Sequence, residues 1–371
     1  MTPRPVIVFL LVVAACNVKP ASPDEKLTAL RPALREAQEI PIAGLERRAW
    51  YAAADDARET LVTLDSERRF AVVRSSGIVS SRSMRDIMRE GGCGHGKEDP
   101  MLGFVSVGIS GDGREAWFLG MDGSKTEPQR MLTAACIVDI ASGAARSMRN
   151  ELGDPVHLRA HTIERSALPS VMIGSKVAVL WGARDEIEVV RRGTPRPVLL
   201  DVGTHAGPCE VREAGNELDV ACVMNAERGL VSLSRFDLSE MPPRLIVRND
   251  VDLDTAQPVL VLSTDGRHVA YRGQTPISKI PCMGVATVHD GKIIEALLLV
   301  RRTPLALDIA SKRGGVIMTY GEGPTALQGF DGTEEQRFDL GCRPRALFLS
   351  PDASRVWCHS LDDHLRLYAT N

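Results

Sequence analysis

Short runs in which apolar and polar residues alternate cover most of the chain, and small turn residues separate them. The pattern is clearest in three stretches: VSVGISGDGREAWFL from Val105, PVLVLSTDGRHVAYR from Pro258 and LFLSPDASRVWCHS from Leu347. In each stretch an alternating run leads into a Ser-x-Asp turn and a second run, which predicts a β-hairpin. Trp117 follows Ser110 at the same spacing as Trp357 follows Ser350, so the hairpins are copies in one register.

The hairpin recurs along the chain. Weaker copies are TLDSERRFAVV around Ser66, MIGSKVAVLW around Ser175, EAGNELDVACV around Gly215 and DIASKRGGVIM around Ser311. The turns are centred near residues 66, 111, 175, 215, 265, 311 and 351, and every step except the one from 111 to 175 spans 40 to 50 residues. That longer step contains the polar insertion NELGDPVHLRAHTIERS. A four-stranded unit repeated at this period predicts a β-propeller.

The fold prediction is therefore an all-β, seven-bladed β-propeller of four-stranded antiparallel blades over residues 46–371. The fourth blade shows its strands best, around PCEVREA, LDVACVM, LVSLSRF and RLIVR. The last copy ends after three strands, and we expect the segment near Trp50 to supply the fourth and close the ring. A β-sandwich or a pair of smaller β domains is the alternative.

The Ser-x-Asp turns at Ser110, Ser263 and Ser350 resemble the WD-like repeats of TolB-type and other bacterial periplasmic propellers. The resemblance covers these three copies well and the other four poorly. It implies a shape and names no function, because one fold serves many functions.

The first residues, MTPRPVIVFLLVVAAC, carry one positive charge at Arg4, then an apolar run, then Cys16. This order predicts a secretory signal peptide over residues 1–15. A transmembrane anchor is the alternative, but the apolar run is shorter than the about 20 residues that span a bilayer.

The end of this segment, Val13-Ala14-Ala15-Cys16, resembles the lipobox of bacterial lipoproteins. The resemblance implies cleavage before Cys16 and attachment of lipid, including palmitate, to that cysteine. Asn17 stands where an aspartate is associated with retention in the inner membrane, so the resemblance implies an outer-membrane anchor facing the periplasm. An ordinary signal peptide followed by an unrelated cysteine is the alternative.

Residues 16–45 are predicted to form a lipidated tether with a short helix. NVKPASPDE is polar and contains proline, and Ser22-Pro23-Asp24-Glu25 has the residues that start a helix. Leu27, Leu30 and Leu34 recur at helical spacing, and we expect the helix to bend or end near Pro32.

The charge of the chain narrows the classes of molecule that it could bind. The chain has 45 basic and 48 acidic side chains, and a net charge of −3 offers no electrostatic basis for binding nucleic acid. We therefore expect a protein of the cell envelope as the partner, with the lipid anchor as the contact with the membrane.

The eight cysteines suit an exported protein, because oxidising compartments favour disulfides. Cys209 and Cys222 flank the turn near 215, and Cys342 and Cys358 flank the turn near 351, where facing residues of a hairpin come close enough to bond. Buried free thiols are the alternative. A third pair is predicted between Cys93 and Cys136, which leaves Cys282 as the odd thiol after Cys16 is assigned to lipid.

Candidate ligand-binding residues fall in the loops that join one blade to the next. In a propeller these loops gather at one face around the central channel, so scattered polar groups would converge at its mouth. Asp250, Asp252 and Asp254 alternate as calcium-loop carboxylates do, but Thr255 and Val261 stand where such a loop needs Gly and Glu. The side chains predicted at the channel mouth are His95, His157, His161, His205, Asp250, Asp252 and Asp254.

The function favoured by these patterns is a membrane-anchored, periplasm-facing propeller that binds or scaffolds an envelope protein without a cofactor. The alternative is a propeller hydrolase or lactonase-type enzyme that uses calcium or another divalent cation at the channel mouth. The loops offer few carboxylates outside the Asp250 group, which favours the platform. No Gly-x-Ser-x-Gly elbow is present, and no catalytic residue is predicted.

Overall fold

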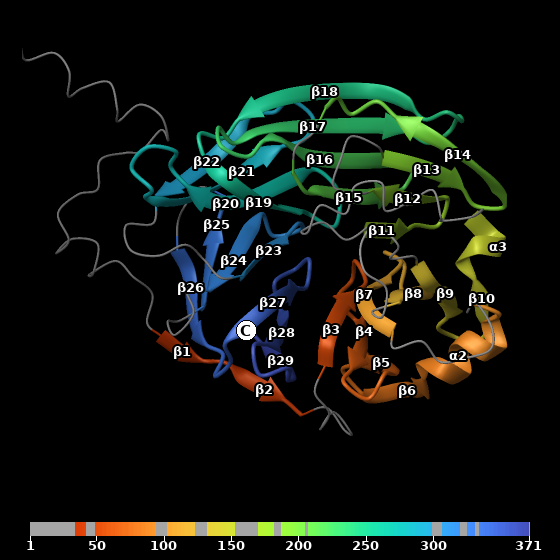
Figure 1. Ribbon diagram of the computed structural model, residues 1–371. Helices are drawn as coiled ribbons and strands as arrows, with labels where there is room; N and C mark the ends of the chain where they lie inside the picture. Colours follow the sequence, from red (N-terminus) through yellow and green to blue (C-terminus); the bar gives the residue numbers. More distant parts are fainter. Residues whose placement is uncertain are drawn as a thin grey trace, which may run out of the picture.

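A computed structural model describes residues 34–41, 49–93, 102–122, 132–152, 170–181, 187–204, 207–298, 306–319, 325–330 and 334–370. Seven sheets stand around a ring (Figure 1), which confirms the predicted seven-bladed propeller. Within each blade the strands are called a to d from the centre of the ring outwards. The a strands of most neighbouring blades contact one another, for example β3 with β7 and β23 with β27, and they form the inner wall.

The first four blades follow one another in chain order. Blade 1 has β3 (Ala49–Ala54), β4 (Thr60–Asp65), β5 (Arg69–Arg74) and β6 (Gly77–Ser83). Blade 2 has β7 (Leu102–Ile109), β8 (Glu115–Asp122), β9 (Leu132–Asp139) and β10 (Ala145–Ser147). Blade 3 has β11 (Ser170–Ile173), β12 (Val177–Trp181), β13 (Ile187–Arg191) and β14 (Thr194–Leu200). Blade 4 has β15 (Cys209–Ala214), β16 (Glu217–Asn225), β17 (Leu230–Asp237) and β18 (Arg244–Asp252), as the sequence predicted.

The remaining blades complete the ring. Blade 5 has β19 (Ala256–Leu262), β20 (His268–Gln274), β21 (Pro281–Thr287) and β22 (Ile293–Leu298). Blade 6 has β23 (Ala306–Ala310), β24 (Gly315–Thr319), β25 (Thr325–Gly329) and β26 (Glu334–Asp339). Blade 7 has β27 (Pro344–Leu349), β28 (Arg355–Ser360) and β29 (Leu365–Ala369).

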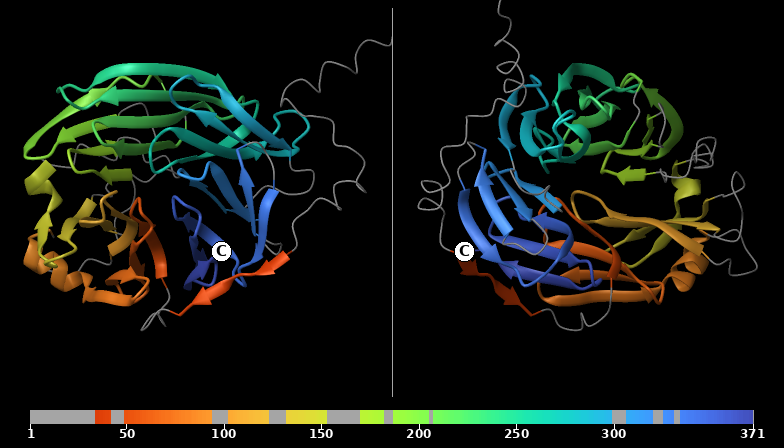
Figure 2. Two further views of the ribbon diagram at one scale, coloured as in Figure 1. Left: turned by 180° about the vertical axis from the view of Figure 1, so that it is seen from behind. Right: turned by 60° about the vertical axis from the view of Figure 1, so that its left-hand side comes forward.

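Two N-terminal strands close the ring. β1 (Leu34–Glu36) pairs in parallel with β26, and β2 (Gln38–Ile40) pairs antiparallel with β29 as the d strand of blade 7. Figures 1 and 2 show this segment lying along the C-terminal blades. The prediction that the segment near Trp50 supplies this strand was wrong, because Trp50 lies in β3, the a strand of blade 1. The propeller therefore starts at Leu34, before the expected boundary at residue 46. Strands β1 and β2 cover the outer edges of β26 and β29, which would otherwise be unpaired.

The hydroxyl of the turn serine explains the repeated Ser-x-Asp motif. Ser110 Oγ accepts the backbone N–H of Glu115 (3.0 Å) and donates to Asp112 (2.7 Å), which braces the a-to-b turn. Ser263 and Ser350 make the same bonds in blades 5 and 7.

The first blade departs from this motif. The turn predicted around Ser66 joins strands b and c, and the a-to-b turn of blade 1 spans residues 55–59. There the carboxylate of Asp55 accepts the N–H groups of Glu59 (2.9 Å) and Thr60 (3.2 Å). An aspartate thus replaces the serine at the same offsets, which is why the serine pattern predicted the b-to-c turn near Ser66 in place of this a-to-b turn.

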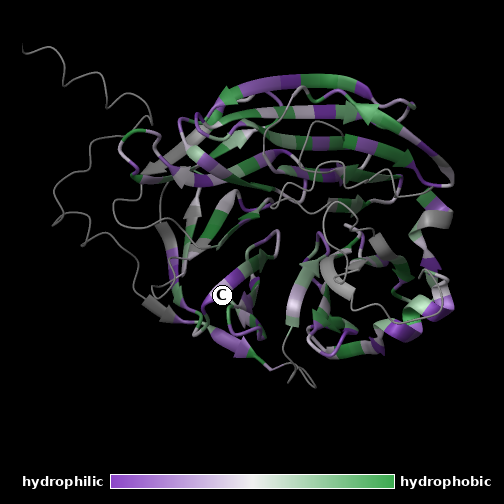
Figure 3. Ribbon diagram, viewed as in Figure 1, coloured by the Kyte–Doolittle hydropathy of each residue, from purple (hydrophilic) through white to green (hydrophobic). Residues whose placement is uncertain are grey.

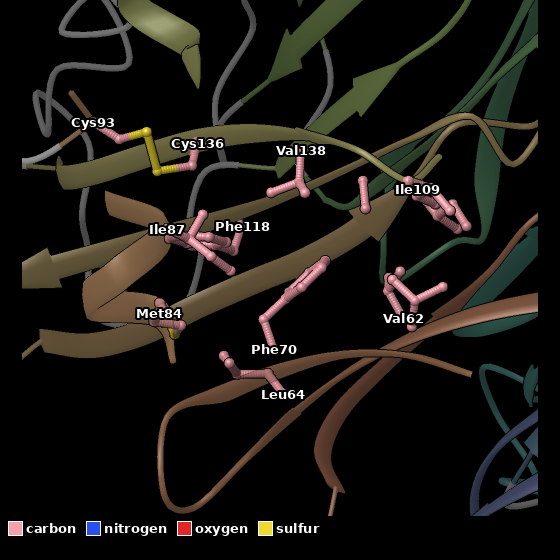
Figure 4. Close-up of a cluster of buried hydrophobic side chains, with 13 residues drawn as sticks. Val62, Leu64, Phe70, Met84, Ile87, Cys93, Ile109, Phe118, Cys136 and Val138 are labelled. Atoms are coloured by element: carbon pink, nitrogen blue, oxygen red, sulfur yellow. A yellow bond between two sulfur atoms is a disulfide. The ribbon is translucent and has the colours of Figure 1, made fainter. Parts of the chain in front are cut away.

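The core lies between adjacent blades. The b and c strands are covered on both faces, so strand β16 is apolar at nearly every buried position, whereas outer strands such as β18 mix polar and apolar residues (Figure 3). Figure 4 shows one such layer between blades 1 and 2, where Phe70 and Phe118 pack with ring centroids 6.1 Å apart. Helix α2 (Met84–Gly91) adds Met84 and Ile87 to it, and the short α3 (Met148–Leu152) adds two buried residues to the next layer.

The three predicted disulfides are confirmed. Cys209 and Cys222 face each other in the register of β15 and β16, with Cα atoms 4.2 Å apart. Cys342 is bonded to Cys358 in blade 7, and Cys93, just after α2, is bonded to Cys136 of β9 (Figure 4). Cys282 is buried and forms no disulfide among the described residues, and its Sγ lies 3.1 Å from Thr255 Oγ1.

The predicted signal peptide, Cys16 and most of the expected N-terminal helix lie outside the described residues. Leu34, which the prediction placed on that helix, begins β1. Neither α2 nor α3 is long and apolar enough to cross a membrane.

Candidate functional site

The loops from strand d to the next strand a share one end of the propeller with the b-to-c turns, and we call this end the da face. Asp250, Asp252 and Asp254 lie at this face, at the end of β18 and in the loop after it. His95, His157, His161 and His205 lie outside the described residues, so their convergence stays a prediction.

Two carboxylates of the Asp250 group, those of Asp250 and Asp252, bind protein groups. Asp250 accepts Arg248 Nε at 3.3 Å, and Asp252 pairs with Arg228 at 3.7 Å and accepts the backbone N–H of Asp254 at 2.9 Å. Burial and the neighbouring Asp252 raise the pKa of Asp254. No three His, Cys, Asp or Glu side chains gather at metal-binding distance in the part of the chain that the structure describes.

A pocket of about 870 Å³ opens on the da face between blades 4 and 5, directly beside the Asp250 group. Its volume lies within the range of ligand sites in proteins. We call it the blade 4–5 pocket. Its polar lining consists of Glu227, Arg228, Gln257, Arg272, Gln274 and Lys279.

A β-bulge at the start of β19 brings Gln257 to the blade 4–5 pocket. The register of β19 against β20 shifts between Ala256 and Val259, so Gln257 leaves the regular ladder. Its φ of 52° lies in the left-handed region, which a residue with a side chain rarely adopts. Bulges and such backbone strain are common beside binding sites, where they redirect a side chain.

Two braced b-to-c turns hold the other side chains. In blade 4, Asn225 Oδ1 accepts the N–H groups of Glu227 and Arg228, both at 3.0 Å. In blade 5, the Thr275 carbonyl accepts the N–H of Lys279 at 3.1 Å, and the Thr275 hydroxyl accepts the N–H of Ile280 at 3.0 Å. The pocket rim is therefore hydrogen-bonded to itself and needs little ordering when a ligand binds.

Arg272 lies near the end of β20, opposite Val259 of β19, and is half-buried. No ion pair joins it to another side chain within the described ranges. Burial lowers its pKa, and no carboxylate of the described residues offsets that effect. A guanidinium stays protonated in proteins, so the pocket contains a partly desolvated positive charge without a counter-ion from the described residues.

Comparisons with known proteins support the propeller fold and do not identify a functional site. No family model matches the chain, and no curated protein matches it. Among solved structures, a chain of Kuenenia stuttgartiensis hydrazine synthase is similar, with a TM-score of 0.57 and 13% sequence identity over 89% of this chain and 99% of that one. At this identity the likeness shows the propeller fold alone.

Exposed apolar side chains lie on the b-to-c turn of blade 5 and on β19, the two segments that also contribute to the blade 4–5 pocket. Ile277, in the b-to-c turn of blade 5, is 86% exposed, and Ile280 and Val259 are 37% and 42% exposed. Pro276 and Val259 belong to the pocket lining itself. Several exposed apolar side chains on one turn and the strand beside it, unlike a single one, are characteristic of a contact surface.

A smaller pocket of about 560 Å³ opens at the opposite end of the propeller, the ab face, around the a-to-b turn of blade 1. Its lining carries Asp55, Glu59 and Asp112 together with Arg74 and Arg355. Glu59 pairs with Arg355 at 3.6 Å, and Asp55 braces the backbone of its own turn. Most of its charged groups already have partners in the protein, so the blade 4–5 pocket is the better candidate site.

The centre of the ring is closed by ion pairs near the ab face. Arg58 of blade 1 pairs with Asp308 of blade 6 at 3.1 Å, and Arg212 of blade 4 pairs with Asp56 of blade 1. Glu210 of β15 is close enough to Arg212 and Asp308 to feel their charges, but it forms no hydrogen bond or ion pair with them. The Glu210 side chain is exposed to solvent, but protein groups surround it on all sides. The resulting desolvation raises its pKa to about 7.

Asp250, Asp252 and Asp254 of the predicted cation site share the da face with the blade 4–5 pocket, and that cation site stays a prediction. The pocket exposes Arg272 and Lys279, which the sequence prediction did not include. A signal for Arg272 exists in the repeat, because HVAYRGQ places a charged residue directly after the buried Val269, Ala270 and Tyr271 of strand b. Its lack of a partner depends on blade 4 and could not be read from that stretch.

Proposed function

We propose that this chain is an exported, lipid-anchored β-propeller that binds another protein of the cell envelope through the part of the da face around the blade 4–5 pocket. The observation that carries the proposal is Ile277, an isoleucine 86% exposed on a hydrogen-bonded turn beside an open pocket. Burying such a side chain against a partner stabilises a complex by about 1.5–3 kcal/mol.

The disulfides support export. Three bonds among the described residues suit an oxidising compartment such as the periplasm, since cytosolic thiols are kept reduced. The signal peptide over residues 1–15 and lipidation of Cys16 belong to the same proposal, with the outer membrane, facing the periplasm, as the location.

The strands β1 and β2 determine where a tether would join the propeller. They lie on the outer edges of blades 6 and 7, so residues 16–33 would lead from the lipid to the rim of the ring. Eighteen residues span at most about 60 Å when fully extended, which leaves the da face free to reach a partner. A Cys16→Ser variant that still fractionates with membranes would contradict the anchor.

Cross-linked pull-down from cell envelopes tests the binding function. The wild-type chain is compared with Ile277→Asp, which places a charge at the proposed contact, and with Leu199→Asp as a control. Leu199 is 59% exposed on the outer strand β14 of blade 3, away from the blade 4–5 pocket. We expect one partner to be captured by wild type and by Leu199→Asp and lost with Ile277→Asp. Equal capture by all three would refute this contact surface.

A further inference from the structure

The ionic balance of the blade 4–5 pocket favours an anion. Arg228 is paired with Asp252, whereas Arg272 and Lys279 have no ion pair with the described residues. Glu227 is the acidic residue of the lining, and no salt bridge among the described residues joins it to either cation. Two unneutralised cations therefore face one carboxylate across the same space.

The uncharged groups of the lining suit a ligand that has a peptide backbone and apolar side chains in addition to a negative charge. The amides of Gln257 and Gln274 can each donate and accept hydrogen bonds, as a peptide backbone requires. Val259 lies directly opposite Arg272 in the β19–β20 ladder, Pro276 lines the same pocket, and the exposed Ile277 follows Pro276 in the b-to-c turn of blade 5. Positive charge, amide groups and exposed apolar surface thus lie side by side.

We propose that the blade 4–5 pocket binds an acidic side chain of an extended peptide segment, with Arg272 as the group that meets the carboxylate and Ile277 as the surface for an adjacent apolar residue. The proposal rests on the binding function above and names the chemistry of the partner. A planar guanidinium binds both oxygens of a carboxylate, and a charge-assisted pair is stronger where water is partly excluded.

Arg272 is arranged for this role at a cost to the unliganded protein. Its pKa is lowered by burial alone, so the free protein holds a desolvated charge that a bound carboxylate would compensate. The φ of 52° at Gln257 is a second strained feature of the same pocket. A purely structural arginine would be expected to form an ion pair with its own chain.

Titration calorimetry with two short peptides tests the proposal. The probe is a pentapeptide of alternating leucine and glutamate, acetylated and amidated so that side chains carry its only carboxylates; the matched peptide has glutamine for each glutamate. We expect the wild-type protein to bind the glutamate peptide at least about tenfold more tightly, the scale of a hydrogen-bonded charge. Equal binding of the two peptides would overturn the proposal.

Variants locate the site. Arg272→Gln is expected to remove the preference for the glutamate peptide, and Glu227→Gln is expected to strengthen its binding two- to threefold, about the effect of one screened like charge. Arg114→Gln makes the same charge change on the ab face, where Arg114 is exposed in the a-to-b turn of blade 2, and should leave binding unchanged. An equal loss in Arg272→Gln and Arg114→Gln would contradict a specific site.

Two readouts separate this proposal from simpler explanations. Arg272→Gln removes an uncompensated charge, so its unfolding temperature should equal or exceed that of wild type; a large decrease would make Arg272 structural. Acetate, citrate and inorganic phosphate are titrated in parallel, and a small anion that binds as tightly as the peptide would show a metabolite site instead. If Ile277→Asp keeps the envelope partner while Arg272→Gln still loses the peptide, the contact surface fails and the carboxylate site stands.

Discussion

Arg58 and Asp308 form a buried ion pair although 250 positions separate them in the sequence. Arg58 lies in the a-to-b turn of blade 1, and Asp308 lies on the a strand of blade 6. Asp308 also accepts the backbone N–H of Leu349 in blade 7 at 2.7 Å, and Trp357 of blade 7 donates to the Arg58 carbonyl at 3.0 Å. This one pair therefore joins the three blades at which the ring closes.

Asp308→Ala is expected to destabilise the propeller by about 3–5 kcal/mol, because it leaves the Arg58 guanidinium buried without a counter-charge. Urea unfolding followed by tryptophan fluorescence measures the change. Arg244→Ala is the control, since it removes an exposed pair with Asp237 and should cost at most about 1 kcal/mol. Similar losses in the two variants would mean that the Arg58–Asp308 pair does not hold the ring closed.

The cysteine pairing predicts a thiol count. The chain has eight cysteines, and three disulfides occupy six of them. A Cys16→Ser variant produced under oxidising conditions and purified without reductant should therefore expose one thiol in denaturant, that of Cys282, and seven after reduction. Three or more thiols before reduction would show that at least one of the bonds is absent.

Glu210 predicts a pH dependence of stability. Its pKa of about 7 in the folded protein exceeds the ordinary 4.5, so the folded state binds the proton more tightly. The resulting stabilisation is present below pH 4.5 and is lost as the pH rises through 7. Glu210→Gln should therefore gain stability relative to wild type between pH 5 and pH 8. Solvent around the side chain keeps the gain below the limit of about 1.4 kcal/mol per pH unit.

Thermal unfolding of the two proteins at pH 5 and pH 8 measures this difference. Asp219, whose pKa burial raises to about 6, titrates in the same direction, and burial lowers the pKa of His359 and of His268, which act in the opposite direction. These groups are common to both proteins, so the comparison isolates Glu210. A difference that is the same at both pH values would contradict the raised pKa.

Local patterns predicted most of the fold. The Ser-x-Asp turns at Ser110, Ser263 and Ser350 and the alternation around them depend only on residues close in sequence, and so does the pairing of Cys209 with Cys222 across one hairpin. The turn at Asp55 was not predicted, because a carboxylate there accepts the backbone N–H groups that a serine hydroxyl accepts in the other turns.

The closure of the ring could not be predicted in the same way. Strands β1 and β2 have three residues each, too few for alternation to be recognised, and they are strands because the edges of β26 and β29 pair with them. Their neighbours in space are some 300 positions away in the chain, so no local signal marks them.

The sequence by itself determined the repeat, the blade count and the pairings Cys209–Cys222 and Cys342–Cys358 across single hairpins, since hairpins and turns are stabilised by contacts between near neighbours. The tertiary structure alone decided which charges are neutralised. Arg58 pairs with Asp308 across the point where the ring closes, and Arg228 pairs with Asp252, whereas Arg272 has no counter-charge among the described residues. Charge pairing depends on distance in space, and in a closed ring that distance is set by blades far apart in the chain.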